Sequence, residues 1–487
     1  MENPKLQKLH DEWLEEATIQ EMQEKLSSGE LTSKELILLY LHRISTFDKG
    51  INSILELNPD ALQIAAALDA ERKETGPRSL LHGIPILIKD NIDTKDKMHT
   101  SAGSLALKDS IALRDSYVAK LLRKVGAVIL GKTNMTEWAN FMAKGMKNGY
   151  SSRGGQVLNP YGPGKFDVGG SSSGSGAAIA ANLAAAAVGT ETSGSILYPS
   201  CLNSLVGIKP TVGLISRRGI IPIAHTQDTA GPMARTVEDA ATLLNALNGR
   251  DEEDPITRTN PFVDYDFTKH LLKDGLKGKR IGIAWEGFVE PMREDQRGVI
   301  LTVIEVLKSS GAEVIENIVI PSVKAKWKYD VLTYEFKLDL NAYLNGLHPT
   351  VPIRTLKDLI KFNQNNEESM LKYGQAVLLE SEKTSGTLTE KAYFEALEFD
   401  RYHATVKGID YALETYQLDV IVFPGEEGSH ISAKAGYPTI AVPAGYTASG
   451  EPVGITLAGT AYSEPVLIEV AYGFEQLTLV RKPPVLE

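Results

Sequence analysis

The chain has 487 residues, a formal net charge of -11 at pH 7, 43% hydrophobic residues and a single cysteine, Cys201. The negative charge argues against nucleic acid or an anionic membrane as a partner, and one cysteine rules out an intramolecular disulfide. No run of about eighteen apolar residues predicts a membrane span. The charged first residues, MENPKLQKLHDEWLEEA, do not resemble a signal peptide, so we expect a cytoplasmic location.

Two capping boxes mark helix starts in the first 75 residues. Thr18 and Thr32 are each followed three residues later by glutamate, the spacing in which each side chain binds the other residue's backbone N–H. A third helix is predicted over residues 58–75, with Pro59 in its first turn. Residues 1–75 are therefore predicted to be a helical region that packs on a sheet.

Strand and helix patterns alternate along most of the remaining chain, which is typical of an α/β fold. Strands are predicted at 81–89, 127–130, 279–285, 312–320, 418–424, 438–443 and 454–457, and helices at 115–126, 296–311 and 463–476. We expect a large mixed, mostly parallel twisted sheet with helices on both faces. The acidic stretch DEEDP at 251–255 marks a boundary.

Residues 165–210 have the most distinctive composition. Four serines, Ser171, Ser172, Ser173 and Ser175, lie among glycines in a predicted loop. Residues 177–187 are almost all alanine, which predicts a buried helix. The predicted helix of about eleven residues covers roughly 16 Å, and about seven extended residues after it, 188–194, cover roughly 23 Å in the return direction. The chain can therefore come back to the start of the helix, so Ser171 and Ser195 are predicted to share one site.

Lys89 follows an apolar run, residues 84–88, that predicts a buried strand. A serine hydroxyl does not ionise near neutral pH, so a serine nucleophile needs a base, and no histidine lies in these motifs. Burial lowers the pKa of a lysine and makes its neutral amine available. Ser171 could pass a proton from Ser195 to Lys89, because a hydroxyl both donates and accepts. Backbone N–H groups of Thr192, Ser193, Gly194 and Ser195 could converge on a developing oxyanion.

The motifs GGSSSGSGAA, GTETSGSILYPS and GIKPTVGLIS resemble the amidase signature family. The resemblance extends to LHGIPILIKDNI, GAVILGKTNMTEWA and QDTAGPMARTVEDAATLLN, and covers roughly the whole chain. It implies a Ser-cis-Ser-Lys triad formed by Ser195, Ser171 and Lys89, with a cis peptide bond before Ser171. It also implies an acyl-enzyme that is hydrolysed by water. We therefore predict an amidase that converts a neutral carboxylic amide or a peptide C-terminal amide into an acid and ammonia.

The resemblance also sets the expected organisation. One amidase domain at 1–487 would consist of the helical region 1–75, a catalytic core at 76–250, a variable substrate-entrance region at 251–405, and C-terminal strands and a helix at 406–487. Substrate contacts are predicted at Gly170, Ser172, Ser101 and Gly103. No metal site and no cofactor are predicted, because cysteine and histidine form no cluster with metal-ligand spacing. The predicted partner is a small-molecule amide, and the chain is expected to be a monomer or a homodimer.

Three other functions fit parts of the sequence. GSSSG at 170–174 matches the nucleophile elbow of an esterase, with Ser172 as nucleophile, but the preceding residues do not predict a strand. The core also resembles the A subunit of a tRNA-dependent glutamine amidotransferase. Leu197 stands where that subunit has an arginine, which favours a neutral amide and the peptide-amidase branch. A phosphate-binding module is the third alternative, although the loop lacks the Lys-Ser/Thr ending of a P-loop.

Overall fold

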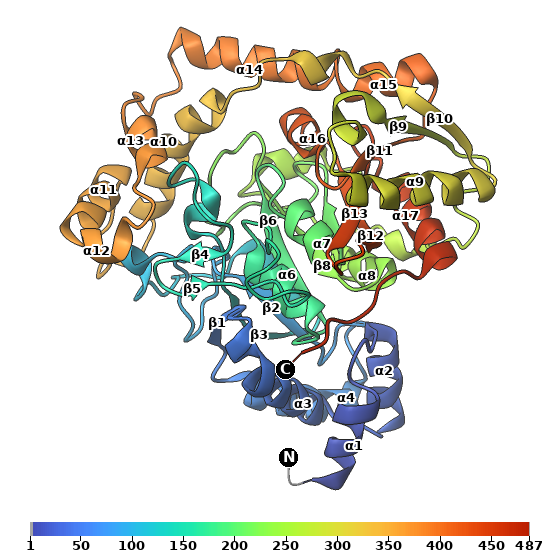
Figure 1. Ribbon diagram of the computed structural model, residues 1–487. Helices are drawn as coiled ribbons and strands as arrows, with labels where there is room; N and C mark the ends of the chain where they lie inside the picture. Colours follow the sequence, from blue (N-terminus) through green and yellow to red (C-terminus); the bar gives the residue numbers. More distant parts are fainter. Residues whose placement is uncertain (1–2, 487) are drawn as a thin grey trace.

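The computed structural model describes residues 3–486, and its central feature is an eleven-stranded sheet with the order β1-β3-β2-β6-β8-β7-β12-β13-β11-β9-β10 (Figure 1). The strands are β1 (Ile54–Leu57), β2 (Pro85–Lys89), β3 (Val128–Thr133), β6 (Ala186–Glu191), β7 (Val206–Lys209), β8 (Thr229–Ala234), β9 (Arg280–Ala284), β10 (Glu313–Ile318), β11 (Val420–Pro424), β12 (Thr439–Tyr446) and β13 (Pro452–Ala458). A separate hairpin pairs β4 (Tyr150–Ser151) with β5 (Gly155–Gln156).

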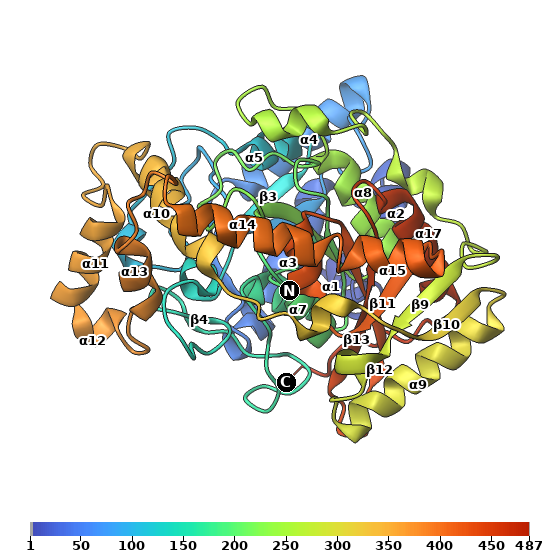
Figure 2. The same cartoon turned by 90° about the horizontal axis from the view of Figure 1, so that it is seen from above.

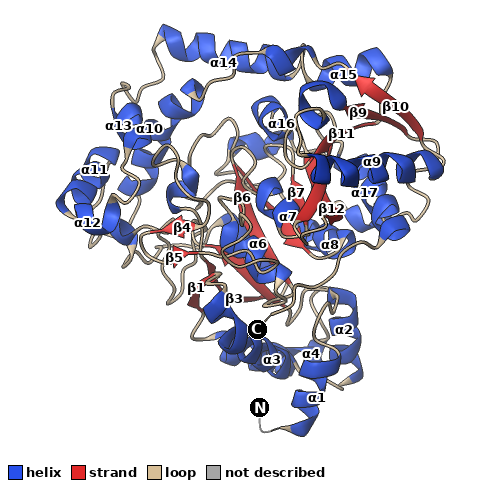
Figure 3. Ribbon diagram, in the orientation of Figure 1, coloured by secondary structure: helices blue, strands red, loops and turns tan. Residues whose placement is uncertain are grey.

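The helices surround this sheet (Figure 3). They are α1 (Pro4–Glu12), α2 (Ile19–Ser28), α3 (Ser33–Phe47), α4 (Ala61–Thr75), α5 (Tyr117–Lys124), α6 (Ser173–Ala180), α7 (Leu197–Leu202), α8 (Val237–Leu247), α9 (Glu294–Ser309), α10 (Asp330–Asn345), α11 (Leu356–Asn365), α12 (Glu367–Met370), α13 (Ala376–Glu382), α14 (Lys391–Ala404), α15 (Ile409–Tyr416), α16 (Ser429–Ala435) and α17 (Glu464–Thr478). Both predicted capping boxes are present, at Thr18 before α2 and at Thr32 before α3.

The predicted α/β class and the large mixed sheet are confirmed. Parallel pairing joins β3 to β2 and β2 to β6, and again β11 to β9 and β9 to β10. The strands between these two groups pair antiparallel, so the sheet contains more antiparallel pairs than we expected. Strands β7 and β8 were not predicted; β8 follows β7 and β13 follows β12 with no helix between them, and strands connected in this way pair antiparallel.

The predicted helix at 177–187 is wrong in its boundaries. Helix α6 begins inside the glycine-serine loop at Ser173 and ends at Ala180, while Ala186 and Ala187 belong to β6. Alanine has no side chain long enough to distinguish a buried helix from a buried strand, so composition alone could not locate this break. Helix α6 packs against α7 and against β2, β3, β6 and β8. The loop before α6 and the loop before α7 therefore lie next to the ends of these strands.

The region between β10 and β11 forms a helical layer at the edge of the molecule. Helices α10, α11, α13 and α14 pack on one another, and Figure 1 shows them as an arc at the left and top of the molecule, while Figure 2 shows α14 running from α10 toward α15. A hydrophobic cluster joins this layer to loops of the core, with Phe336 of α10 against Phe141. No helix within residues 3–486 has both the length and the apolar character needed to cross a bilayer.

Candidate active site

The site lies where two neighbouring parallel strands end. Lys89 is the last residue of β2 and Glu191 is the last residue of β6, and the two strands pair directly, with Ile88 opposite Val188. Ser171 lies in the loop that leads into α6, and Ser195 lies in the loop between β6 and α7. Because the carboxyl ends of paired parallel strands meet at one edge, the fold brings all four residues to the same place.

Lys89 is completely buried and surrounded by hydroxyl groups. Its Nζ atom lies 2.8 Å from Ser171 Oγ, 2.9 Å from Ser172 Oγ and 2.9 Å from Thr190 Oγ1. The Thr190 carbonyl oxygen is a fourth acceptor at 3.2 Å. An ammonium group has three hydrogens, one fewer than the number of oxygens around Nζ. This environment therefore also suits a neutral amine, which can accept a proton from one of the hydroxyls.

Burial lowers the pKa of Lys89 to about 7, even though the negative charges of Glu191 and Asp228 act in the opposite direction. A free lysine would be almost fully protonated at pH 7. A pKa near 7 instead makes about half of the amines neutral at that pH, which is the state a general base requires.

The peptide bond between Gly170 and Ser171 is cis, as predicted. Gly170 is tightly enclosed, since an added Cβ would lie 2.6 Å from Thr136 Oγ1 and 2.8 Å from Asn148 Oδ1. The Ser171 carbonyl accepts a hydrogen bond from Thr136 N at 3.1 Å. The loop before α6 is therefore fixed on both sides of Ser171, whose side chain is directed to Lys89.

Ser195 borders a cavity of about 750 Å³ together with Gly170, Thr192 and Ser193. Its carbonyl oxygen accepts a hydrogen bond from Ser172 N at 3.2 Å, which joins the two loops. Within residues 3–486 the Ser195 hydroxyl forms no hydrogen bond, in contrast to those of Ser171 and Ser172. The structure therefore places Ser195 at the cavity with a free hydroxyl.

The Glu191 carboxylate organises the loop that carries Ser195. Its oxygens accept hydrogen bonds from Gly194 N at 2.7 Å, Ile196 N at 2.8 Å and Leu197 N at 3.1 Å. The N–H of Gly194 is thus already engaged, which argues against its predicted role as an oxyanion donor. The N–H groups of Thr192, Ser193 and Ser195 have no hydrogen-bond partner in the described part of the chain.

Asp228 supports the same loop from its other end. It accepts hydrogen bonds from Thr192 Oγ1 at 2.5 Å, Ile223 N at 2.8 Å and Ala224 N at 3.0 Å. Burial raises the pKa of Asp228 to about 7, partly offset by these hydrogen bonds. The sequence prediction missed both Glu191 and Asp228, although each lies in a quoted motif, because a motif does not reveal which backbone groups a carboxylate will reach.

Three of the four predicted substrate contacts lie away from the cavity. Ser101 Oγ and Gly103 N both donate to the buried Asp90 carboxylate, the latter at 2.9 Å, so they serve the structure of their own loop. Ser172 is fully buried and bonded to Lys89 and to the Thr190 carbonyl. Only Gly170 of this set borders the cavity. The structure therefore supports only Gly170 as a substrate contact at this cavity, because the polar groups of Ser101, Gly103 and Ser172 bind other groups of the protein.

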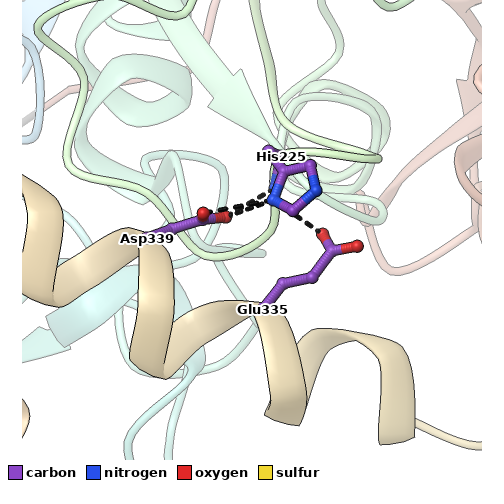
Figure 4. A group of neighbouring side chains, drawn as sticks. All are labelled: His225, Glu335 and Asp339. Atoms are coloured by element: carbon purple, nitrogen blue, oxygen red, sulfur yellow. Dashed lines mark hydrogen bonds and ion pairs between the residues drawn. The ribbon is translucent and has the colours of Figure 1, made fainter. Parts of the chain in front are cut away.

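His225, Glu335 and Asp339 form a cluster that the sequence did not predict (Figure 4). His225 Nδ1 lies 2.9 Å from Asp339 Oδ2 and 3.5 Å from Glu335 Oε2. The Glu335 carboxylate also accepts hydrogen bonds from Thr226 N at 3.0 Å and from the Tyr393 hydroxyl at 2.8 Å. These contacts join α10 to the loop that carries Asp228, so the cluster connects the helical layer to the active-site wall.

Several known proteins are similar to this chain over nearly its whole length. The Amidase family model matches residues 35–468. A probable amidase of Arabidopsis thaliana is 43% identical over 484 residues, which cover 97% of this chain and 92% of that protein. The native peptide amidase from Stenotrophomonas maltophilia is 44% identical with a TM-score of 0.91, covering 97% of this chain and 99% of that one. An amidase family protein from Bacillus anthracis is 42% identical with a TM-score of 0.94, covering 99% of this chain and 94% of that one. The chain therefore belongs to the amidase family.

Proposed function

We propose that this amidase hydrolyses a neutral carboxylic amide or a peptide C-terminal amide by acyl transfer to Ser195. The single observation that carries the proposal is the buried Lys89, with Nζ 2.8 Å from Ser171 Oγ, beside a cavity that Ser195 lines. In the proposed scheme Ser195 is the nucleophile, Ser171 the relay and Lys89 the base.

In the acylation step, Ser195 Oγ forms a bond to the amide carbon while its proton passes to Ser171 Oγ. The Ser171 proton moves to the neutral Lys89 amine, so one proton is transferred overall. The tetrahedral intermediate then loses its carbon–nitrogen bond, and the departing nitrogen receives the proton returned through Ser171. Ammonia and an acyl-Ser195 ester result.

In the deacylation step, water attacks the ester carbon and gives its proton to the same Ser171–Lys89 relay. The carbon–oxygen bond to Ser195 breaks, and the proton returns to Ser195 Oγ. The products are the carboxylic acid and the regenerated enzyme. The free N–H groups of Thr192, Ser193 and Ser195 are the proposed donors to the oxyanion in both steps.

A neutral amide is favoured by the charges at the cavity. Lys144 borders it but forms an ion pair with Glu380 at 2.7 Å. Burial lowers the pKa of His430 to about 4, so this residue is neutral at pH 7. The described residues therefore offer no free positive charge at the cavity to bind a carboxylate near the amide. The relative from Stenotrophomonas maltophilia is a peptide amidase, which supports the same substrate class.

The proposal is tested by measuring ammonia release from a panel of amides, with a peptide amide, an aliphatic amide, an aryl amide and glutamine. We expect release from neutral amides, and Ser195→Ala should lower it by at least 10³-fold because the nucleophile is lost. Ser309→Ala is the control, since Ser309 is an exposed serine at the end of α9. Glutamine as the preferred substrate would favour the amidotransferase A subunit instead, and an unchanged rate in Ser195→Ala would refute the proposal.

A further inference from the structure

Lys209 is a buried lysine that the proposed mechanism does not use. It is the last residue of β7, and it has no exposed surface. Its Nζ atom forms no hydrogen bond to any group of residues 3–486. Removing an ammonium group from water costs several kcal/mol unless other charges compensate, so the fold must provide an interaction that makes this lysine tolerable.

Glu191 provides the compensating charge. Only β8 separates β6 from β7 in the sheet. Gly189 and Gly207 lie on the face covered by Ile196, because an added Cβ on either glycine would contact the Ile196 side chain. Glu191 and Lys209 are each two residues farther along the same strands and therefore lie on the same face. Burial raises the pKa of Glu191, and the charge of Lys209 is the strongest effect that opposes this rise.

The ionised form of Glu191 is the form that fits its surroundings. Three backbone N–H groups, from Gly194, Ile196 and Leu197, point at its two oxygens. A carboxylate accepts all three, whereas a protonated carboxyl carries a hydrogen on one oxygen and loses acceptor capacity there. Protonation would therefore release part of the loop that holds Ser195 and the oxyanion donors.

We propose that Lys209 is a positioning residue that acts through Glu191: its ammonium group keeps the Glu191 carboxylate ionised, and the carboxylate holds the Ser195 loop in its active shape. This inference rests on the proposed amidase function. Burial lowers the pKa of Lys209 to about 8, so its side chain is still mostly protonated at pH 7. The role is distinct from that of Lys89, which must be neutral to act.

Other charged groups lie near Lys209 and Glu191, and the test must distinguish their effects from the effect of this pair. Lys89 ends β2, which pairs with β6 on the side away from β8 and β7, and the negative charge of Glu191 raises the pKa of Lys89. Glu426 also interacts with Glu191 through space. Lys209 faces a second buried carboxylate, Glu464 of α17, which accepts a hydrogen bond from Thr211 N at 2.7 Å. The charge of Glu464 also raises the pKa of Lys209, so the matched control is a different carboxylate of α17, Glu475, which accepts a hydrogen bond from Val237 N at 2.8 Å.

The test compares the pH dependence of kcat/KM for ammonia release in wild type, Lys209→Met, Glu191→Gln and the double variant. Lys209→Met should lower kcat/KM at pH 7 about tenfold or more. Its acid limb should also become steeper, because Glu191 must now lose a proton in the same range as Lys89. Glu475→Gln should leave the shape of the acid limb unchanged.

Glu191→Gln provides a readout that does not depend on the folding of the Lys209 variant. It should lower kcat/KM and move the acid limb to lower pH, because Lys89 loses a neighbouring negative charge. Adding Lys209→Met to Glu191→Gln should change kcat/KM less than twofold, since Lys209 then has no carboxylate to keep ionised.

An acid limb of Lys209→Met that keeps the wild-type shape would overturn the inference. So would an equal effect of Lys209→Met in the presence and absence of Glu191, or a Glu191→Gln variant with the wild-type rate and profile. If wild type releases no ammonia from any amide in the panel, the proposed function itself fails, and this outcome is distinguishable from a failure of the Lys209 role alone.

Discussion

Lys89 combines complete burial with a set of hydroxyl partners, and this combination makes a lysine useful as a base near pH 7. Burial lowers its pKa to about 7. In the proposed mechanism the neutral amine of Lys89 is the active form, so activity should rise as pH increases through this pKa and should fall below it.

We expect log kcat/KM of the wild type to fall with unit slope below about pH 7 and to level off above it. Asp228→Asn removes a negative charge that raises the Lys89 pKa, so its acid limb should move to lower pH. The measurement is the pH profile of ammonia release. An acid limb that lies at the same pH in both proteins would show that Lys89 does not control it.

At this scale the sequence was informative where a residue's role follows from its chemical type. Lys89, Ser171 and Ser195 were predicted because a serine nucleophile without histidine requires another base, and the family resemblance implied which residues these are. The supports of these residues were not predictable. Glu191 and Asp228 bind backbone N–H groups of other loops, and such contacts depend on the path of the chain in three dimensions.

Helix α6 shows how glycine permits two elements to approach closely. An added Cβ at Gly174 would lie 2.3 Å from both the Asn134 and the Ser53 carbonyl oxygens, so the first turn of α6 touches the backbone at the end of β3. This contact holds the loop that contains Ser171. The strand-helix pattern of βαβ units was predictable from hydrophobic periodicity, but the alanine-rich break between α6 and β6 was not, because it has no periodicity.

Gly174→Ala should therefore destabilise the protein by about 2–3 kcal/mol, because the backbone must move to admit a methyl group. Gly298→Ala is the control, since Gly298 lies in α9 and an added Cβ would meet nothing within 4 Å. There alanine should be neutral or stabilise by about 0.5–1 kcal/mol. The measurement is thermal or denaturant unfolding, and equal stability of the two variants would contradict the close packing of α6.

The helical layer from α10 to α14 has its own hydrophobic cluster, distinct from the main core. The cluster of His225, Glu335 and Asp339 links this layer to the active-site wall (Figure 4). The hydrogen bond to Asp339 raises the pKa of His225, burial opposes this rise, and the charges of Glu335 and Asp339 add to it while Arg217 acts against it. This region was predicted to form the substrate entrance on the family resemblance alone. The ion pair between His225 and Asp339 was not predictable, because two residues 114 positions apart leave no local pattern in the sequence.

The raised pKa of His225 determines the direction in which the stability contributed by this cluster changes with pH. Because the pKa of His225 is raised in the folded state, its contribution to the free energy of unfolding is fully present below the unfolded-state pKa. This contribution is lost as pH rises through the folded-state pKa. The contribution is below about 1 kcal/mol, because the His225 side chain is 41% exposed.

We expect the helical layer of the wild type to be cleaved by trypsin more slowly at pH 6 than at pH 8, relative to an unstructured reference peptide at each pH. His225→Ala should remove this difference. His348→Ala, at an exposed histidine after α10, is the control and should retain it. Equal pH dependence in wild type and His225→Ala would show that the cluster does not hold α10.

The central claim is that Ser195 is the nucleophile, and covalent labelling tests it most directly. An activated phosphonate reacts with a nucleophilic serine, and peptide mapping by mass spectrometry identifies the residue. We predict one label on the peptide containing Ser195, abolished in Ser195→Ala and strongly slowed in Lys89→Met. A label on Ser172, or undiminished labelling of the Ser195→Ala protein, would contradict the account.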